Sequence, residues 1–318
     1  MIHTVDTEYT DHTGVAAAFV VEHADGVYVC ETNTSYAVPA ILRTIEASGH
    51  TAEQVTHVII THIHLDHAGG ASALMRACPN ATLLAHPRAA PHAIDPSRIV
   101  AGATAVYGEA RFAELYGTIE PIPEARVRAI AHDEAVEVGG HRLRFLHTRG
   151  HANHHMVVHD EAAQAVFTGD SFGIAYPDVQ PEGTPAHRPA LVFPSTSPTD
   201  FDADAARESL KAIVGTGATS AWLTHFGRVD NLDAIAASLD AQLARYGALA
   251  DALDGSGVEG EELLRQAAEA VDGFFVELLP EPTGEQASLL DLDRDLNGQG
   301  VAVAVERRRY RRARAAKA

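Results

Sequence analysis

The clearest chemistry in the sequence lies at residues 61–70, which read THIHLDHAGG. Four potential metal ligands occur there within six positions, namely His62, His64, Asp66 and His67. Imidazole and carboxylate groups are good ligands for zinc and other borderline divalent ions. A His-x-His pair by itself is more often a solvated surface feature. Here an apolar, β-branched run at residues 55–61 precedes the histidines and two glycines follow them. This pattern predicts a turn at the carboxyl end of a buried strand, where α/β proteins build their sites, and we therefore predict a metal site in this turn.

The pattern HxHxDH is similar to that of the metallo-β-lactamase-fold hydrolases, and three later motifs follow in that family's order. The family's third histidine usually lies in a T-P-G-H turn, and residues 148–151 read TRGH, with arginine in place of proline. The family's bridging aspartate follows a strand as F-x-G-D, and residues 167–170 read FTGD. A last histidine follows another strand, where residues 222–225 read WLTH. The resemblance covers about residues 14–250.

This resemblance implies a role for each ligand of a two-metal centre. One metal would be held by His62, His64 and His151, the second by Asp66, His67 and His225, and Asp170 would bridge the two. The implied cofactors are two divalent ions, with zinc expected and iron or manganese accepted by the same ligand set. Two such ions share a water and lower its pKa toward about 7, which supplies a bridging hydroxide at neutral pH. Asp66 would be the catalytic residue that orients this nucleophile and passes a proton to the leaving group.

The order of the predicted elements favours two sheets packed face to face with helices outside. Strand–helix units begin the chain, short alternating strands fill residues 126–167, and strand–helix units return afterwards. Together with the resemblance, this order predicts an α/β fold, the four-layer αβ/βα sandwich of metallo-β-lactamase type. We expect a catalytic domain over residues 1–250. A turn-rich break near residues 254–257 should separate it from a mainly helical C-terminal extension over residues 251–318, which ends in a basic tail.

Composition argues against several other classes of protein. The 43 acidic and 24 basic residues give a net charge of −19, which disfavours nucleic-acid binding through a broad basic face. Only two cysteines occur, so a disulfide scaffold is not expected. No apolar run approaches the roughly 20 residues that span a bilayer, and the polar N-terminus does not resemble a signal peptide. We therefore expect a cytoplasmic protein that does not interact with membranes.

The tail is the exception to the acidic composition, with six arginines in the eight residues 307–314. Such a tail can contact the phosphates of a nucleic acid. It can also form ion pairs with the acidic surface of its own chain, and the net charge of −19 favours this second interpretation. A nucleic-acid partner is therefore an open but less favoured alternative.

Two further segments are expected to shape a substrate pocket. Residues 87–124 contain two or three helical stretches, and residues 172–199 form a proline-rich loop. The candidate substrate contacts from these segments are Tyr176, Arg188, Arg111 and Phe193. We hypothesise a mainly apolar pocket with one arginine as an anchor for an anionic group. The alternative is that the aromatic residues simply pack these segments onto the sandwich.

The resemblance implies the type of reaction, hydrolysis, more closely than it implies the substrate. True β-lactamases of this fold have no equivalent of Asp170, so this chain is more similar to the group that includes glyoxalase II-like thioesterases, lactonases and small phosphodiesterases. The predicted function is hydrolysis of a small-molecule ester, thioester or lactone. One alternative is a phosphodiesterase or RNA endonuclease that uses the same centre, and a less favoured one is a non-catalytic, metal-dependent ligand sensor. A homodimer is expected from base rates alone.

Overall fold

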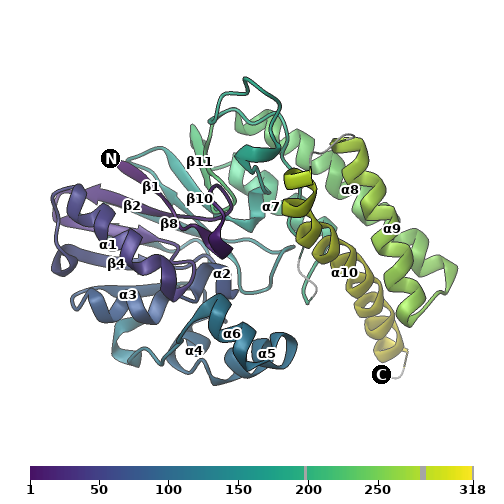
Figure 1. The fold of residues 1–318 in the computed structure, drawn as a ribbon, viewed down its shortest axis with the longest axis horizontal. Coiled ribbons are helices and arrows are strands. Elements are labelled where there is room, and N and C mark those ends of the chain that lie inside the picture. The colour runs from purple at the N-terminus through teal and green to yellow at the C-terminus, as the bar shows by residue number, and fades with distance from the viewer. Residues whose placement is uncertain (197–198, 280–283, 317–318) are drawn as a thin grey trace. The chain divides into compact units, whose positions relative to one another are not determined.

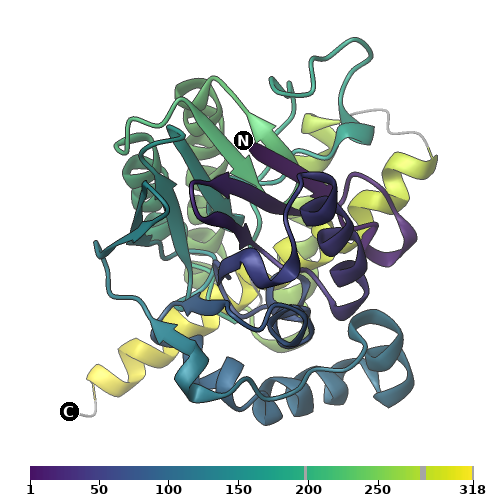
Figure 2. The same ribbon diagram turned by 90° about the vertical axis from the view of Figure 1, so that its left-hand side faces the viewer.

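The computed structural model describes residues 1–196, 199–279 and 284–316. The chain divides into two compact units (Figures 1 and 2). The first unit comprises Met1–His147, His154–Gly169 and Thr216–Asp230, and the second comprises Thr148–Asn153, Asp170–Gly215 and Asn231–Ala318. Among the described residues, no helix is both long enough and apolar enough to cross a membrane.

Two six-stranded sheets form the centre of the first unit. The first sheet has the order β1 (Ile2–Asp6), β2 (Ala17–His23), β3 (Gly26–Cys30), β4 (Val55–Ile59), β5 (Thr82–Ala85) and β6 (Val127–Ala129). The second has the order β12 (Gly227–Val229), β11 (Ser220–Leu223), β10 (Ala165–Gly169), β9 (Met156–Asp160), β8 (His141–His147) and β7 (Ala135–Val138). The strands from β3 to β6 pair in parallel, as do β10 and β11.

Alternation along the strands decides which side chains lie between the sheets. On β2, Phe19 belongs to the apolar cluster shared by the two sheets, whereas its neighbour Val20 belongs to the cluster under the helices, because successive strand residues face opposite sides. The ring of Phe19 lies 5.5 Å from that of Phe167 on β10 and 5.6 Å from that of Trp222 on β11. The two sheets therefore pack face to face, as the sequence predicts.

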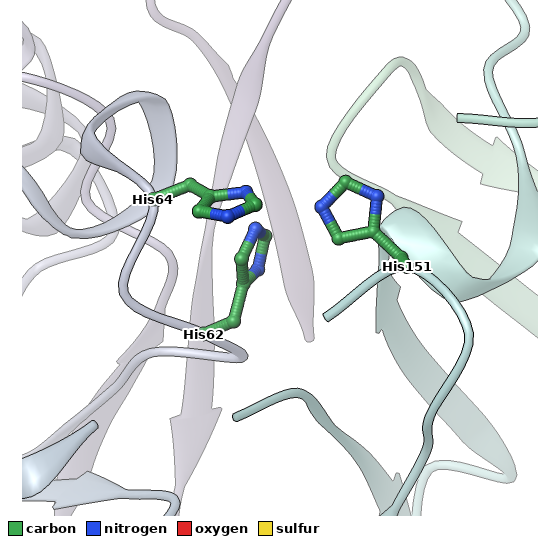
Figure 3. A group of neighbouring side chains, drawn as sticks. All are labelled: His62, His64 and His151. Carbon is green, nitrogen blue, oxygen red and sulfur yellow. The ribbon is translucent and has the colours of Figure 1, made fainter. Parts of the chain in front are cut away.

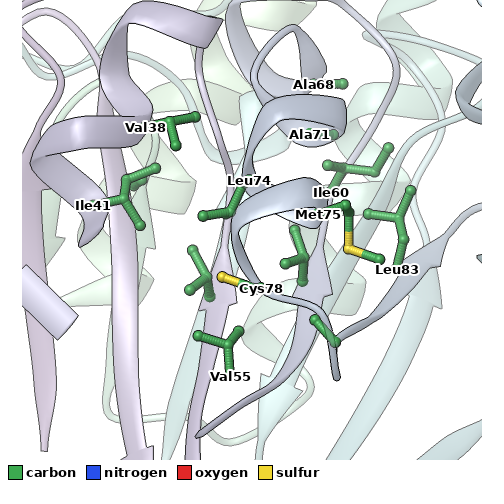
Figure 4. Packing of buried hydrophobic residues seen from close by; sticks show 14 of the residues in the cluster. Val38, Ile41, Val55, Ile60, Ala68, Ala71, Leu74, Met75, Cys78 and Leu83 are labelled. Carbon is green, nitrogen blue, oxygen red and sulfur yellow. The ribbon is translucent and has the colours of Figure 1, made fainter. Parts of the chain in front are cut away.

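Helices of the first unit cover the other face of the first sheet. They are α1 (Val38–Ala47), α2 (Leu65–Ala68), α3 (Ala71–Ala77), α4 (Ala90–Ile94) and α5 (Ser97–Tyr107), and α6 (Glu109–Tyr116) packs on α5. Ile41 of α1 and Leu74 of α3 are fully buried in one apolar cluster with the sheet residues Val55 and Leu83, and the same cluster includes Met75 and Cys78 (Figure 4). The predicted helical insert at residues 87–124 corresponds to α4, α5 and α6.

The second unit contains the longer helices, α7 (Ala203–Val214), α8 (Leu232–Ser256), α9 (Gly260–Leu278) and α10 (Gly284–Ala315). Helices α8, α9 and α10 pack on one another (Figure 1). The predicted fold class, with two sheets, covering helices and a helical C-terminus, is confirmed. The predicted domain boundary at residue 250 falls inside α8, which ends at Ser256 next to the predicted turn, and a separately folding extension over residues 251–318 stays a prediction.

The arginine-rich segment continues α10 and pairs with acidic residues of its own chain. Arg309 donates from Nε to Asp254 Oδ1 at 2.9 Å, and its Nη2 donates to the carbonyl oxygens of Leu253 and Asp254. Arg312 forms two bonds to the same carboxylate, at 2.6 and 2.7 Å. Arg307 pairs with Asp200 and Arg308 with Asp251. The favoured interpretation of the tail, self-pairing with acidic side chains, is confirmed for these four arginines.

We predict that Arg309→Ala lowers the free energy of unfolding by about 1–3 kcal/mol, because the last carbonyl groups of α8 lose a charged hydrogen-bond donor. Urea unfolding at pH 7 measures this loss. Arg311→Ala is the matched control, since Arg311 is exposed on the same helix and exposed substitutions usually change stability by less than about 0.5 kcal/mol. Equal stability of the two variants would contradict the prediction.

The cost of Arg309→Ala should also depend on pH. Hydrogen bonds from Arg312 and then Arg309 lower the pKa of Asp254 to about 2, compared with about 3.9 for a free aspartate. A depressed carboxyl pKa stabilises the fold above the unfolded value, and this contribution is lost as pH falls from about 4 toward 2. The stability difference between wild type and Arg309→Ala should therefore be largest near neutral pH and shrink in this acid range.

Candidate metal centre

The parallel strands of the first sheet end at one edge and bring their following residues together. Cys30 at the end of β3 pairs with Ile59 of β4, and Ile59 pairs with Leu84 of β5. Because the carboxyl ends of parallel strands meet at the same edge, the loop after β4 that holds the four predicted ligands lies beside the polar residues 31–34 that follow β3. Asn33 Nδ2 donates to the carbonyl oxygen of Asp66 at 2.9 Å.

Asp66, His67 and His225 converge within the first unit. Their three ligand atoms lie within 4.8 Å of one another. The Nε2 atoms of His67 and His225 each lie 3.5 Å from Asp66 Oδ2. Metal–ligand bonds of about 2.0–2.1 Å in a tetrahedral site separate two ligands by about 3.3–3.4 Å. The spacing and the donor types therefore fit a divalent metal ion, and the assignment of these three residues as ligands stays a prediction.

The other two predicted ligands of the first unit, His62 and His64, lie side by side. Their ring centroids are 4.4 Å apart and their ring planes are inclined at 76° (Figure 3). The ring of His62 also lies 4.0 Å from that of His67. The three histidines of the loop after β4 therefore lie close together.

His151 and Asp170 form a pair within the second unit. The Nε2 atom of His151 lies 3.3 Å from Asp170 Oδ2, and both side chains are buried. Ser195 Oγ donates to Asp170 Oδ2 at 2.9 Å and lies 3.3 Å from His151 Nδ1. The carbonyl oxygen of Ser195 also lies 3.3 Å from this Nδ1. One serine therefore contacts two predicted ligands.

Orienting hydrogen bonds at the Nδ1 atoms are the feature that the sequence did not reveal. His67 Nδ1 lies 3.1 Å from Glu31 Oε2, His62 Nδ1 lies 3.1 Å from Thr61 Oγ1, and His225 Nδ1 donates to the carbonyl oxygen of Val15 at 2.7 Å. With the Nδ1 side of each ring engaged, Nε2 is the atom that each ring would offer to a metal.

Glu31 has the largest supporting role among these residues. Its side chain is fully buried, and its Oε1 accepts from the backbone N–H of Thr61 at 3.0 Å while Oε2 contacts His67. Its φ of 68° lies in the left-handed region, which non-glycine residues adopt at a cost. The signal that could have identified it is its position, as the first polar residue after β3 in a sheet whose next strand carries the histidines.

Three ionisable side chains of the first unit have pKa values that burial shifts. Burial raises the pKa of Tyr9, and the charge of Asp66 raises it further. Burial likewise raises the pKa of Tyr116 on α6, with smaller contributions from Tyr9 and Asp66. Both phenols therefore stay protonated at neutral pH. Burial, followed by repulsion from His147 and His154, lowers the pKa of His86 to about 3, so this imidazole is neutral at pH 7.

The four predicted substrate contacts lie in different environments. Tyr176 and Phe193 are buried, with ring centroids 5.9 Å apart, and Phe193 also packs against Phe275 of α9 at 5.2 Å. Arg111 is exposed on α6 and pairs with Glu114 at 2.7 Å. Arg188 is exposed in the loop 172–199, of which residues 197–198 lie outside the described residues. Packing explains the two aromatic residues, and substrate contact by any of the four stays a prediction.

A comparison with known protein families shows to which family this chain is related. The model of the metallo-beta-lactamase superfamily matches residues 13–217, which is more than half of the chain. The chain belongs to the metallo-beta-lactamase superfamily. The predicted membership of this superfamily, which consists largely of metal-dependent hydrolases, is confirmed. The glyoxalase II-like subgroup stays a prediction.

Curated relatives of this superfamily member align over part of their length. The metallo-beta-lactamase fold-containing protein ST1585 of Sulfurisphaera tokodaii is 26% identical over 180 residues, which are 56% of this chain and 62% of that protein. Thioesterase pkgB of Emericella nidulans is 34% identical over 117 residues, which are 37% of this chain and 24% of that protein. The chain thus matches less than two thirds of the length of either relative.

Solved structures support the fold. The crystal structure of ST1585 has a TM-score of 0.64 at 19% identity and covers 94% of this chain and 97% of its own. The metallo-beta-lactamase family protein TTHA1429 from Thermus thermophilus has a TM-score of 0.59 at 19% identity and covers 97% of this chain and 93% of its own. At these identities, the two similarities show the fold and no substrate.

We predict that Glu31→Gln weakens zinc binding by about 10- to 100-fold, because the buried carboxylate that orients His67 loses its charge. Competition with a chromogenic chelator measures the affinity. Glu22→Gln is the matched control, since Glu22 also contacts a histidine, His3, at 2.6 Å, but on the edge strands β1 and β2. Wild-type affinity in Glu31→Gln would show that His67 needs no such support.

Proposed function

We propose that this protein hydrolyses a small-molecule ester, thioester or lactone with two divalent metal ions. The observation that carries the proposal is the convergence of Asp66, His67 and His225, whose Nε2–Oδ2 distances of 3.5 Å suit a metal ion. A solvated cluster of histidines would not need a buried carboxylate on the Nδ1 side of His67. Such support is typical of metal-ligating histidines.

The proposed ligand sets are those that the resemblance of the sequence motifs implies. His62, His64 and His151 would hold one ion, Asp66, His67 and His225 the other, and Asp170 would be the shared ligand. Zinc is the ion we propose, and iron or manganese would accept the same donors. When bound, two such ions lower the pKa of a shared water and polarise the carbonyl group of an acyl substrate.

Asp66 is the proposed proton carrier of the reaction. Its side chain is 29% exposed, whereas those of His67 and His225 are buried, so it is the ligand of this set that solvent and substrate can reach. In hydrolysis, a water oxygen forms a bond to the acyl carbon and the bond to the leaving sulfur or oxygen breaks. Asp66 would accept the proton of the attacking water and return it to the leaving group.

Two observations support acyl transfer over phosphodiester cleavage. The curated relative pkgB is named a thioesterase and shares 34% identity over the aligned segment. Four arginines of the tail are paired with acidic side chains of the same chain, and this supports self-pairing of the tail over contact with RNA phosphates. We propose a small-molecule substrate accordingly, and a homodimer and a cytoplasmic location stay predictions.

We predict that the zinc-loaded protein hydrolyses an activated thioester, such as S-lactoylglutathione, with kcat/KM in the usual enzyme range of about 10⁴–10⁸ M⁻¹s⁻¹, and an activated phosphodiester far more slowly. Parallel assays on one preparation measure the ratio of the two kcat/KM values. Because both reactions need the same metals, this ratio reports which class of substrate the site binds productively. A large preference for the phosphodiester would overturn the acyl assignment.

We predict that Asp170→Asn lowers kcat for any accepted substrate by at least about 100-fold, because the shared ligand loses its charge. Asp233→Asn is the control, since Asp233 is exposed in the first turn of α8. Activity of Asp170→Asn at the wild-type level would refute the two-metal mechanism.

Removal of metal should also lower the melting temperature, because the clustered ligands are stabilised by the ion that only the folded state binds. Thermal unfolding with and without chelator measures this shift, and re-addition of zinc should restore it. A melting temperature that chelation leaves unchanged would contradict the proposed metal centre.

A further inference from the structure

Helix α10 lies beyond residues 13–217, which the superfamily model matches, and carries a buried amide with two defined partners. Asn297 is 1% exposed. Its Oδ1 accepts from the backbone N–H of Thr196 at 2.8 Å, and its Nδ2 donates to the carbonyl oxygen of Pro194 at 3.1 Å. Thr196 Oγ1 donates back to the carbonyl oxygen of Leu296 at 3.1 Å. The helix thus holds the backbone on both sides of Ser195.

Ser195 in turn contacts two predicted metal ligands. Its hydroxyl group donates to Asp170 Oδ2 at 2.9 Å. His151 Nδ1 lies 3.3 Å from both the hydroxyl and the carbonyl oxygen of Ser195. A hydrogen bond donated from Nδ1 to this carbonyl selects the tautomer in which Nε2 has a free lone pair for a metal. The segment 194–196 therefore links α10 to a histidine and to the shared aspartate.

The other contacts of this loop do not replace this link. Upstream, Ile174 and Phe193 form a β-bridge, and Gln242 of α8 donates to the carbonyl oxygen of Val192 at 2.7 Å. Both contacts precede Ser195 in the chain. Packing of α10 itself rests on apolar side chains such as Val301 and Val305, which are fully buried. Asn297 is thus not needed to bury the helix, and its two hydrogen bonds act on the loop.

We propose that Ser195 and Asn297 are positioning residues for the metal centre, and that α10 sets the orientation of His151 and Asp170 through the segment 194–196. The inference rests on the proposed function, because it assigns these residues to a metal site that His151 and Asp170 would share. It gives the C-terminal helix a role in the chemistry of the catalytic fold, in addition to its role in packing.

The test compares five variants of the full chain, each measured for zinc affinity by chelator competition, for the absorption bands of the cobalt-substituted protein, and for the melting temperature of the metal-free form. Ser195→Ala removes the hydroxyl group. Asn297→Leu keeps the volume but removes both amide hydrogen bonds, and Thr196→Val removes only the bond to Leu296. Val301→Ala is the matched control, because it weakens the packing of α10 without touching the loop. His151→Ala is the reference for a lost ligand.

We expect Ser195→Ala to bind zinc about 10- to 100-fold more weakly than wild type, and Asn297→Leu to lose about 3- to 10-fold, with altered cobalt bands in both. Thr196→Val should lose less than Asn297→Leu. Val301→Ala should melt at a lower temperature while its zinc affinity and cobalt bands match wild type. This pattern separates an effect on ligand orientation from a general loss of stability.

Wild-type zinc affinity in Ser195→Ala would overturn the role of Ser195. Wild-type affinity and spectra in both Asn297→Leu and Thr196→Val would overturn the role of α10, and should Asn297→Leu fail to fold, Thr196→Val alone decides this point. His151→Ala distinguishes failure of the proposed metal centre from failure of the proposed positioning role. Unchanged zinc binding in that variant would refute the proposed metal centre itself, whereas strong loss there with no effect in the other variants would refute only the positioning by Ser195 and α10.

Discussion

The orientation of imidazole rings is the constraint on which the site depends. A histidine that binds a metal must present one nitrogen to the ion, and the opposite nitrogen decides which way the ring faces. In this protein the opposing partners come from chain segments far apart in sequence: Glu31 for His67, the Val15 carbonyl group for His225, and Ser195 for His151. Glu31 directly follows β3, the partner of His225 is a backbone carbonyl group, and Ser195 lies in the segment held by α10.

The sandwich supplies this rigidity through its two faces. Strands β3 and β4 have apolar side chains on both faces, since Val29 and Val58 belong to the cluster that includes α1 and α3, whereas Cys30 and Ile59 belong to the cluster shared with the second sheet. Parallel pairing of β3 with β4 puts Glu31 beside Thr61, where it accepts the backbone N–H at 3.0 Å. A fully buried carboxylate is costly unless it is hydrogen-bonded on both oxygens. The cost therefore favours a single arrangement of this loop and histidine.

The acidic composition and the arginine-rich tail have a common explanation in the second unit. A chain with a net charge of −19 repels itself when compact. The arginines at the end of α10 reduce this repulsion locally, since two of them share Asp254 and the others pair with Asp200 and Asp251. About three to four turns before these arginines, the same helix presents Asn297 to the loop that carries Ser195. Charge pairing and ligand support are thus properties of one helix.

The sequence by itself predicted the metal ligands and determined the class of fold. The ligands in residues 61–70 are close in sequence and follow a strand, so local spacing is enough to identify them. The later motifs at His151, Asp170 and His225 each follow a strand as well, and their resemblance to a known family supplied their roles. Alternating and β-branched runs predicted the strands because burial on a pleated sheet depends on local pattern.

Only the tertiary structure decided which residues support those ligands. Glu31 and Ser195 are single polar residues without a motif, and their partners lie 36 and 44 positions away. The edge strand β1 was not predicted, because its residues are only partly buried and gain their pairing from β2. Composition favoured carboxylates over phosphates as partners of the tail, but only the structure placed it beside Asp254. Contacts between distant segments depend on how the helices and strands pack, and no local sequence pattern predicts that packing.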